Sequence, residues 1–122
     1  MELYTGVDSV SVDRIAKSLE SARFAERFFS QEEQSYFKTK GKMGLAQTVA
    51  GHFAAKEAFS KAMGTGVRGF DLNEVGIIHD NNGKPFFLLT GRAKALCGKK
   101  RLSLSITHTE IAATAFVVAW EE

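Results

Sequence analysis

Hydrophobic and polar positions alternate with two different periods along the chain. Through most of residues 11–63 apolar residues recur every three or four positions, as in amphipathic helices, whereas several later stretches alternate residue by residue, as in half-buried strands. The expected helices are 11–19, 22–29 (a continuation or a second helix), 31–38, 44–63 and 91–98, and the expected strands are 3–10, 72–79, 85–89, 102–107 and 112–120. Helices first and strands mostly afterwards predict an α+β fold, with helices packed on a mainly antiparallel sheet.

Local signals set several boundaries. Ser30 followed by Glu33 is typical of a capping box, so a helix should begin at residue 31. Gly64 suits a left-handed cap at the end of the longest helix. The polar stretch 38–44 predicts a mobile loop, and residues 81–83 (NNG) predict the turn of a hairpin.

The longest expected helix carries two stripes. Leu45, Val49 and Phe53 are four residues apart and predict an inward face, which continues to Glu57 and Lys61. Small residues beside them would let another backbone come close: Ala46, Ala50, Ala54, Ala58 and Ala62. A carboxylate that continues an apolar stripe should have a partner. A Glu57–Lys61 surface pair, worth a few tenths of a kcal/mol, is the simpler explanation on spacing alone.

Asp8 is open to two interpretations. It follows Gly6 and Val7 at the expected end of a strand, where a carboxylate often caps the next helix. A Mg²⁺ site, however, often needs only one or two protein carboxylates, because water and substrate phosphates complete the octahedron. Asp8 and Glu57 could supply that pair, and Lys61 could neutralise a phosphate one turn away.

Weaker candidates lie in loops and at strand ends. The segment 64–69 (GTGVRG) permits close approach of a ligand to the backbone but lacks the spacing of a Walker loop. His108, between two threonines where a strand ends, suits an anion, although a lone histidine is more often structural. His52 and His79 carry less weight.

Composition narrows the classes of function. At 122 residues the chain should form one domain, residues 1–122, small enough for self-association to add burial. A net charge of +2 is too small for a general nucleic-acid binder. The single cysteine excludes an internal disulfide, and we find neither a secretory signal nor a membrane span, so we expect a cytoplasmic protein. The basic residues Arg14, Arg23 and Arg27 suit docking of an acidic protein, unless they are only a solvated face.

Four motifs occur in a characteristic order: GVDSVSVDRI at 6–15, HFAAKEAFSKAMGTG at 52–66, NGKP at 82–85 and SLSITHT at 103–109. Over nearly its whole length the chain resembles the bacterial holo-acyl-carrier-protein synthases, the small class of 4′-phosphopantetheinyl transferases. The resemblance implies a homotrimer with active sites between subunits. It also implies transfer of phosphopantetheine from coenzyme A to a serine of apo-acyl carrier protein in fatty acid biosynthesis, releasing adenosine 3′,5′-bisphosphate.

By position, the resemblance makes Asp8 and Glu57 Mg²⁺ ligands. The residues it implies for coenzyme A are Lys61 and Gly64 at the pyrophosphate, Asn82, Gly83 and Pro85 near the adenosine, and His108 with Thr109 near the 3′-phosphate. Arg14 and Arg23 would match the residues that dock the carrier protein. The proton of the attacking serine would pass to a metal-bound water or to a carboxylate such as Glu57.

Two features depart from the family pattern. His52 stands where the family usually has an arginine that helps to hold a coenzyme A phosphate, so affinity or its pH dependence should differ. The opening Tyr4-Thr5-Gly6 lacks the usual extra glycine, which leaves the local turn open. Two rival hypotheses are a non-catalytic coenzyme A or nucleotide-binding module and an interaction protein that uses only its basic helix.

Overall fold

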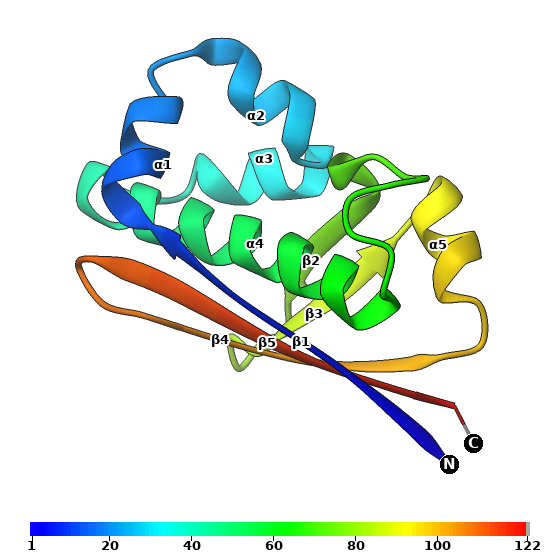
Figure 1. Ribbon diagram of the computed structural model, residues 1–122. Helices are drawn as coiled ribbons and strands as arrows, with labels where there is room; N and C mark the ends of the chain where they lie inside the picture. The colour runs from blue at the N-terminus through cyan, green and yellow to red at the C-terminus, as the bar shows by residue number, and fades with distance from the viewer. Residues whose placement is uncertain (122) are drawn as a thin grey trace.

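The computed structural model describes residues 1–121, except for the side chain of Met43. Three antiparallel strands form the main sheet in the order β1 (Glu2–Ser11), β5 (Ala112–Glu121) and β4 (Arg101–His108). A separate hairpin pairs β2 (Val75–His79) with β3 (Pro85–Leu89). The helices gather on one side of the main sheet, with the longest helix lying against it (Figure 1). This arrangement confirms the predicted α+β fold.

The helices follow the predicted pattern with changed boundaries. They are α1 (Val12–Ser18), α2 (Ala22–Phe28), α3 (Gln31–Phe37), α4 (Lys42–Met63) and α5 (Gly91–Cys97). The segment 22–29 thus forms a second helix. Because α4 begins at Lys42, the predicted loop is shorter than 38–44. The start of the expected strand 72–79 is instead a short 3₁₀ turn, η1 (Leu72–Glu74), where the Glu74 carboxylate accepts from the Asp71 N–H at 2.9 Å.

Two predicted helix ends are confirmed in detail. The Ser30 hydroxyl accepts from the Glu33 N–H at 3.2 Å, and the Glu33 carboxylate accepts from the Ser30 N–H at 3.0 Å. Gly64 closes α4 with φ of 75°, a left-handed conformation that favours glycine. The predicted turn between β2 and β3 is also present, with Gly83 at φ of 83°.

The small-residue stripe of α4 lets strand β1 come close to the helix. Ala54 and Ala58 are fully buried and Ala62 nearly so. A Cβ atom added to Gly6 would lie only 1.9 Å from the Ala58 carbonyl oxygen. Gly6 is therefore needed for close packing of β1 on α4. Strand β1 runs without interruption through residues 4–6, so the sequence that lacks the family's extra glycine forms no turn there. The predicted approach of another backbone is therefore confirmed.

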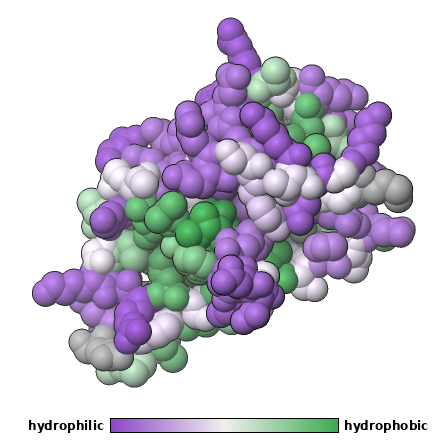
Figure 2. Space-filling view, turned by 180° about the vertical axis from the view of Figure 1, so that it is seen from behind, coloured by the Kyte–Doolittle hydropathy of each residue, from purple (hydrophilic) through white to green (hydrophobic). Residues whose placement is uncertain are grey.

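The face of the main sheet away from α4 carries exposed apolar residues. Val7 and Phe116 are paired across β1 and β5, with exposed fractions of 52% and 44%, and Leu3 is exposed further along β1. The separate hairpin adds two more exposed apolar side chains, Phe86 and Leu88, at alternate positions of β3. Viewed from behind, the molecule shows apolar side chains gathered in a patch among hydrophilic ones (Figure 2). No helix within residues 1–121 has the length and hydropathy of a membrane span.

Candidate active site on strand β1 and helix α4

Asp8 lies in the middle of strand β1 and does not cap a helix. It pairs with Ala115 of β5, and the strand continues for three more residues. The cap of α1 is Ser11, whose hydroxyl accepts from the Arg14 N–H at 3.3 Å. The expected strand 3–10 is confirmed with one more residue at each end, whereas the capping role allowed for Asp8 is wrong. The Asp8 side chain instead faces the C-terminal half of α4.

Lys61 of α4 contacts β1 directly. Its Nζ donates to Asp8 Oδ1 at 3.2 Å and to the Val7 carbonyl oxygen at 2.9 Å. Among the described residues, Lys61 forms its ion pair with Asp8 and not with Glu57. The Glu57–Lys61 surface pair, the simpler explanation of their spacing, therefore does not form. Because the Lys61 side chain is 54% exposed, solvent screens this pair, and its contribution to stability is small. Its amino group remains available for an anion.

Glu57 is half-buried on the same side of α4, one turn before Lys61. Burial raises the pKa of its carboxyl group above the ordinary value, the negative charge of Asp8 raises it further, and the charge of Lys61 partly opposes both. Asp8 and Glu57 therefore lie close enough to repel each other. A cation between them would relieve this repulsion.

The donor set fits Mg²⁺. Within the described part of the chain no three His, Cys, Asp or Glu side chains cluster as a complete metal site. Two carboxylates with hard oxygen donors, however, are what Mg²⁺ usually takes from a protein when a substrate phosphate and water supply the rest. Gly64, predicted to meet the same phosphates, ends α4 three residues after Lys61 and is exposed.

A second feature is a cavity of about 240 Å³ near the N-terminal half of α4. Its lining includes three of the predicted binding residues, Gly83, Pro85 and His108. Asn82 and Thr109 do not line it but belong to adjacent turns, where the Asn82 N–H donates to Asp80 and the Thr109 hydroxyl accepts from two backbone N–H groups. Asp8, Glu57 and Lys61 are absent from the lining. One chain thus presents two separate groups of predicted site residues.

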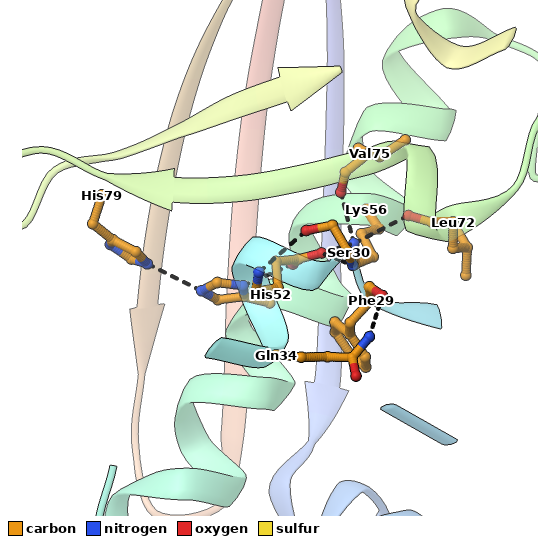
Figure 3. Close-up of polar contacts among 9 residues, drawn as sticks. Phe29, Ser30, Gln34, His52, Lys56, Leu72, Val75 and His79 are labelled. Carbon is orange, nitrogen blue, oxygen red and sulfur yellow. Dashed lines mark hydrogen bonds and ion pairs between the residues drawn. The ribbon is translucent and has the colours of Figure 1, made fainter. Parts of the chain in front are cut away.

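A buried polar network, missed at the level of sequence, borders this cavity. Glu33 lies at its centre and is fully buried, as are Lys56 and, nearly, His52. Lys56 Nζ donates to Glu33 Oε1 and to the carbonyl oxygens of Leu72 and Val75 at 3.0 and 2.7 Å, which ties η1 and β2 to α4 (Figure 3). The available signal was the pair of polar residues four apart, at positions 52 and 56, among the alanines of α4.

Burial and pairing set the charges of this network. Burial alone would raise the pKa of Glu33, but the hydrogen bond to His52 and the charge of Lys56 outweigh it and hold the pKa below its ordinary value. Burial lowers the pKa of His52, although the hydrogen bond to Glu33 opposes the shift. Both ring nitrogens of His52 have protein partners, so this residue does not offer a free donor to a phosphate.

The basic residues of the N-terminal region are exposed. Arg14 projects from α1, and Arg23 and Arg27 from α2. The guanidinium of Arg27 lies 5.1 Å from the ring centre of Phe28. These side chains are accessible to a partner.

Residues 4–118 match the family model of the 4′-phosphopantetheinyl transferase superfamily. The chain belongs to this superfamily. It is 42% identical to the holo-[acyl-carrier-protein] synthase of Thermoanaerobacter sp. (strain X514), over 98% of this chain and 88% of that protein. Against the synthase of Treponema denticola the identity is 40%, over 97% and 98% of the two chains.

Solved structures of transferases in this superfamily share the fold. The holo-[acyl-carrier-protein] synthase from Neisseria meningitidis superposes with a TM-score of 0.85 at 40% identity, covering 97% of this chain and 98% of that one. The synthase from Bacillus anthracis, solved in complex with CoA (3′,5′-ADP), gives a TM-score of 0.84 at 33% identity, covering 95% and 94%. The resemblance expected from the four sequence motifs is therefore confirmed.

Proposed function

We propose that this transferase is a holo-acyl-carrier-protein synthase, which moves the 4′-phosphopantetheine group of coenzyme A to a serine of apo-acyl carrier protein. The similarity over nearly the whole chain supports this reaction. Within this chain, the main support for the reaction is that Asp8 on β1 faces Glu57 and Lys61 on α4. The chain needs no nucleophile of its own, because the partner provides the serine. The whole chain, residues 1–122, would act as one domain in the cytoplasm.

In this proposal Asp8 and Glu57 hold Mg²⁺. When bound, the metal supplies positive charge that offsets the charge developing on the pyrophosphate of coenzyme A. The mutual repulsion of the two carboxylates, seen in the raised pKa of Glu57, supports a cation between them. Lys61 would turn from Asp8 toward the same phosphates and orient them.

The reaction forms a bond between the serine oxygen and the phosphorus of phosphopantetheine and breaks the bond to the leaving adenosine 3′,5′-bisphosphate. The serine must also lose its hydroxyl proton. Glu57 would accept this proton only through an oxygen that the cation leaves free, because its raised pKa belongs to the site without metal and a bound cation lowers it. Exposed Gly64 would allow the pyrophosphate to approach the backbone at the end of α4.

The cavity at His108 would take the adenosine 3′-phosphate end of coenzyme A. Lys40 gives its lining positive charge, His108 adds an imidazole that can hydrogen-bond a phosphate, and Pro85 and Tyr36 give it apolar surface for a base. Asn82, Gly83 and Thr109 would approach the ligand from the adjoining turns. The neighbouring subunit is expected to complete each site.

Assembly and docking follow the same proposal. The uncovered face of the main sheet, with Val7 opposite Phe116, would be buried in a homotrimer, which supports active sites between subunits. Arg14, Arg23 and Arg27 would dock the acidic carrier protein on α1 and α2.

The test is transfer itself. We expect apo-acyl carrier protein, mixed with this chain, coenzyme A and Mg²⁺, to gain the mass of phosphopantetheine while adenosine 3′,5′-bisphosphate appears in equal amount. A carrier of unchanged mass, under conditions in which an established transferase modifies it, would overturn the proposal. Binding of coenzyme A without transfer would favour the rival binding module.

A further inference from the structure

A continuous chain of hydrogen bonds links the buried network to the wall of the cavity. His52 Nδ1 lies 2.8 Å from Glu33 Oε2, and His52 Nε2 lies 3.0 Å from His79 Nε2. His79 Nδ1 lies 3.3 Å from the Gly83 carbonyl oxygen. In Figure 3 the two imidazoles point toward each other, with His52 between His79 and the interior. His52, His79 and Gly83 all line the cavity.

This chain needs one more proton than two neutral imidazoles hold. Both of its ends, an ionised carboxylate and a carbonyl oxygen, only accept hydrogen bonds. Three hydrogen bonds between them therefore require three ring protons, whereas two neutral histidines carry two. The complete chain contains one imidazolium. If the extra proton leaves, one nitrogen lone pair must face another acceptor.

The extra proton belongs on His79. The ionised Glu33, whose pKa is lowered by its partners, fixes the proton of His52 on Nδ1, and burial disfavours a second proton on that ring. His52 Nε2 is then an acceptor for His79. His79 is less buried than His52, and its second nitrogen can donate to Gly83 only when the ring is protonated.

Other ionisable groups face this pair from every neighbouring element. Tyr36 of α3 stacks on His79 at 4.5 Å between ring centres, and the Lys40 amino group lies 4.7 Å from the centre of the Tyr36 ring. The titratable groups around the two histidines are Glu32, Glu33, Tyr36, Lys40, Lys56, Asp80 and His108. Asp80 accepts from the Asn82 and Lys84 N–H groups of its own turn. The only carboxylate bonded to the histidine pair is thus Glu33, among the described residues.

We propose that His79 is a positioning residue for an anionic ligand of the cavity. Its imidazolium form, held by His52 and Glu33, fixes the Gly83 carbonyl and adds positive charge to the cavity wall. In its neutral form the contact with Gly83 becomes repulsive and the charge is lost, while the turn keeps the hydrogen bonds of its own backbone and of Asp80. This role rests on the proposed function, in which the cavity takes the adenosine bisphosphate end of coenzyme A.

The protonation state is measured first, without any ligand. Nitrogen NMR of the ¹⁵N-labelled wild-type protein should show His79 protonated at both ring nitrogens at low pH, and His52 neutral with its proton on Nδ1. An unperturbed imidazole changes charge between about pH 5 and 8, so spectra from pH 5 to 8.5 cover the transition. A His79 ring that is neutral throughout this range would overturn the proposal. This measurement does not depend on any variant folding.

Ligand affinity is measured second, by calorimetry with adenosine 3′,5′-bisphosphate as the probe. His79→Gln keeps a donor and an acceptor but does not titrate. The phosphates of the ligand titrate in both experiments, so the comparison of the two proteins removes their effect. Between pH 6 and 8 we expect the Kd of the wild type to increase about tenfold more than that of the variant, the factor that corresponds to one pKa unit.

The outcomes are distinguishable. Binding with the same pH dependence in the two proteins would overturn the role of His79 and leave the proposed function intact. No binding by the wild type at any pH would overturn the proposed function and this role with it.

Discussion

The substitution Gly6→Ala tests how β1 is held against α4. The new Cβ would lie 1.9 Å from the Ala58 carbonyl oxygen and 2.7 Å from the Ala62 nitrogen. Both are backbone atoms of a helix, so neither can rotate away. Strand β1 must move outward by about 1.5 Å to restore an ordinary contact. A misplacement of about 1 Å can already cost a hundredfold in rate when it affects a catalytic group.

The displacement is transmitted to Asp8, which lies two residues along the same strand. Its distance from Lys61 Nζ, 3.2 Å in the native arrangement, and its position relative to Glu57 would both change. We expect a loss of stability of about 1–3 kcal/mol from overpacking. We also expect kcat/KM for transfer to fall about a hundredfold.

Gly44→Ala is the matched control, because it makes the same chemical change within α4. A Cβ at Gly44 would meet no atom within 4 Å. It should leave transfer unchanged and stabilise the helix by about 0.5–1 kcal/mol. Urea unfolding and transfer kinetics measure both quantities. Wild-type stability and activity in Gly6→Ala would refute the close packing of β1 on α4.

Three further predictions concern the buried network and the docking face. Lys56→Met leaves the Glu33 charge buried without its cation and should lower the free energy of unfolding, measured in urea, by about 3–5 kcal/mol. Adding Glu33→Gln should restore part of that loss, and equal losses in the single and double variants would contradict this account. Because the pKa of Glu33 is lowered in the folded state, its stabilisation is complete above the unfolded pKa of about 4.3 and is lost as the pH falls through the folded value. Acid unfolding curves of wild type and Glu33→Gln should therefore begin to converge as the pH falls below the unfolded pKa and should meet only below the folded one, whereas parallel curves would argue against an ionised Glu33. Arg14→Glu and Arg23→Glu should each raise KM for the carrier about tenfold at low salt with kcat nearly unchanged, and an unaltered KM would exclude this face from docking.

Much of the fold could be predicted because local signals were strong. The Ser30 capping box, the Gly64 cap and the turn at Gly83 each have one favoured conformation, and each formed as expected. The 3₁₀ turn at 72–74 was missed, because its apolar and polar alternation is the same as that of a strand end.

The candidate site was only partly predictable. The i,i+4 spacing showed that Glu57 needed a partner, but spacing within a helix cannot reveal which strand lies opposite. A capping role was allowed for Asp8 because its carboxylate stands shortly before a predicted helix, whereas pairing with β5 keeps the strand extended for three more residues.

The Glu33–His52–His79 chain was not predicted, because it joins three elements that are separate in the sequence. His52 was considered only as a replacement for an arginine at a phosphate. The structure instead gives both of its ring nitrogens protein partners, which no local pattern could show.

The central claim is that Asp8 and Glu57 together hold the metal at the reacting pyrophosphate. The most direct test is the initial rate of transfer from coenzyme A to apo-acyl carrier protein, measured by intact mass over a series of Mg²⁺ concentrations. Compared with the wild type, Asp8→Asn and Glu57→Gln should each need at least about tenfold more Mg²⁺ for half-maximal rate, since each loses one of two charged ligands. Wild-type rates and an unchanged Mg²⁺ dependence in both variants would contradict the account.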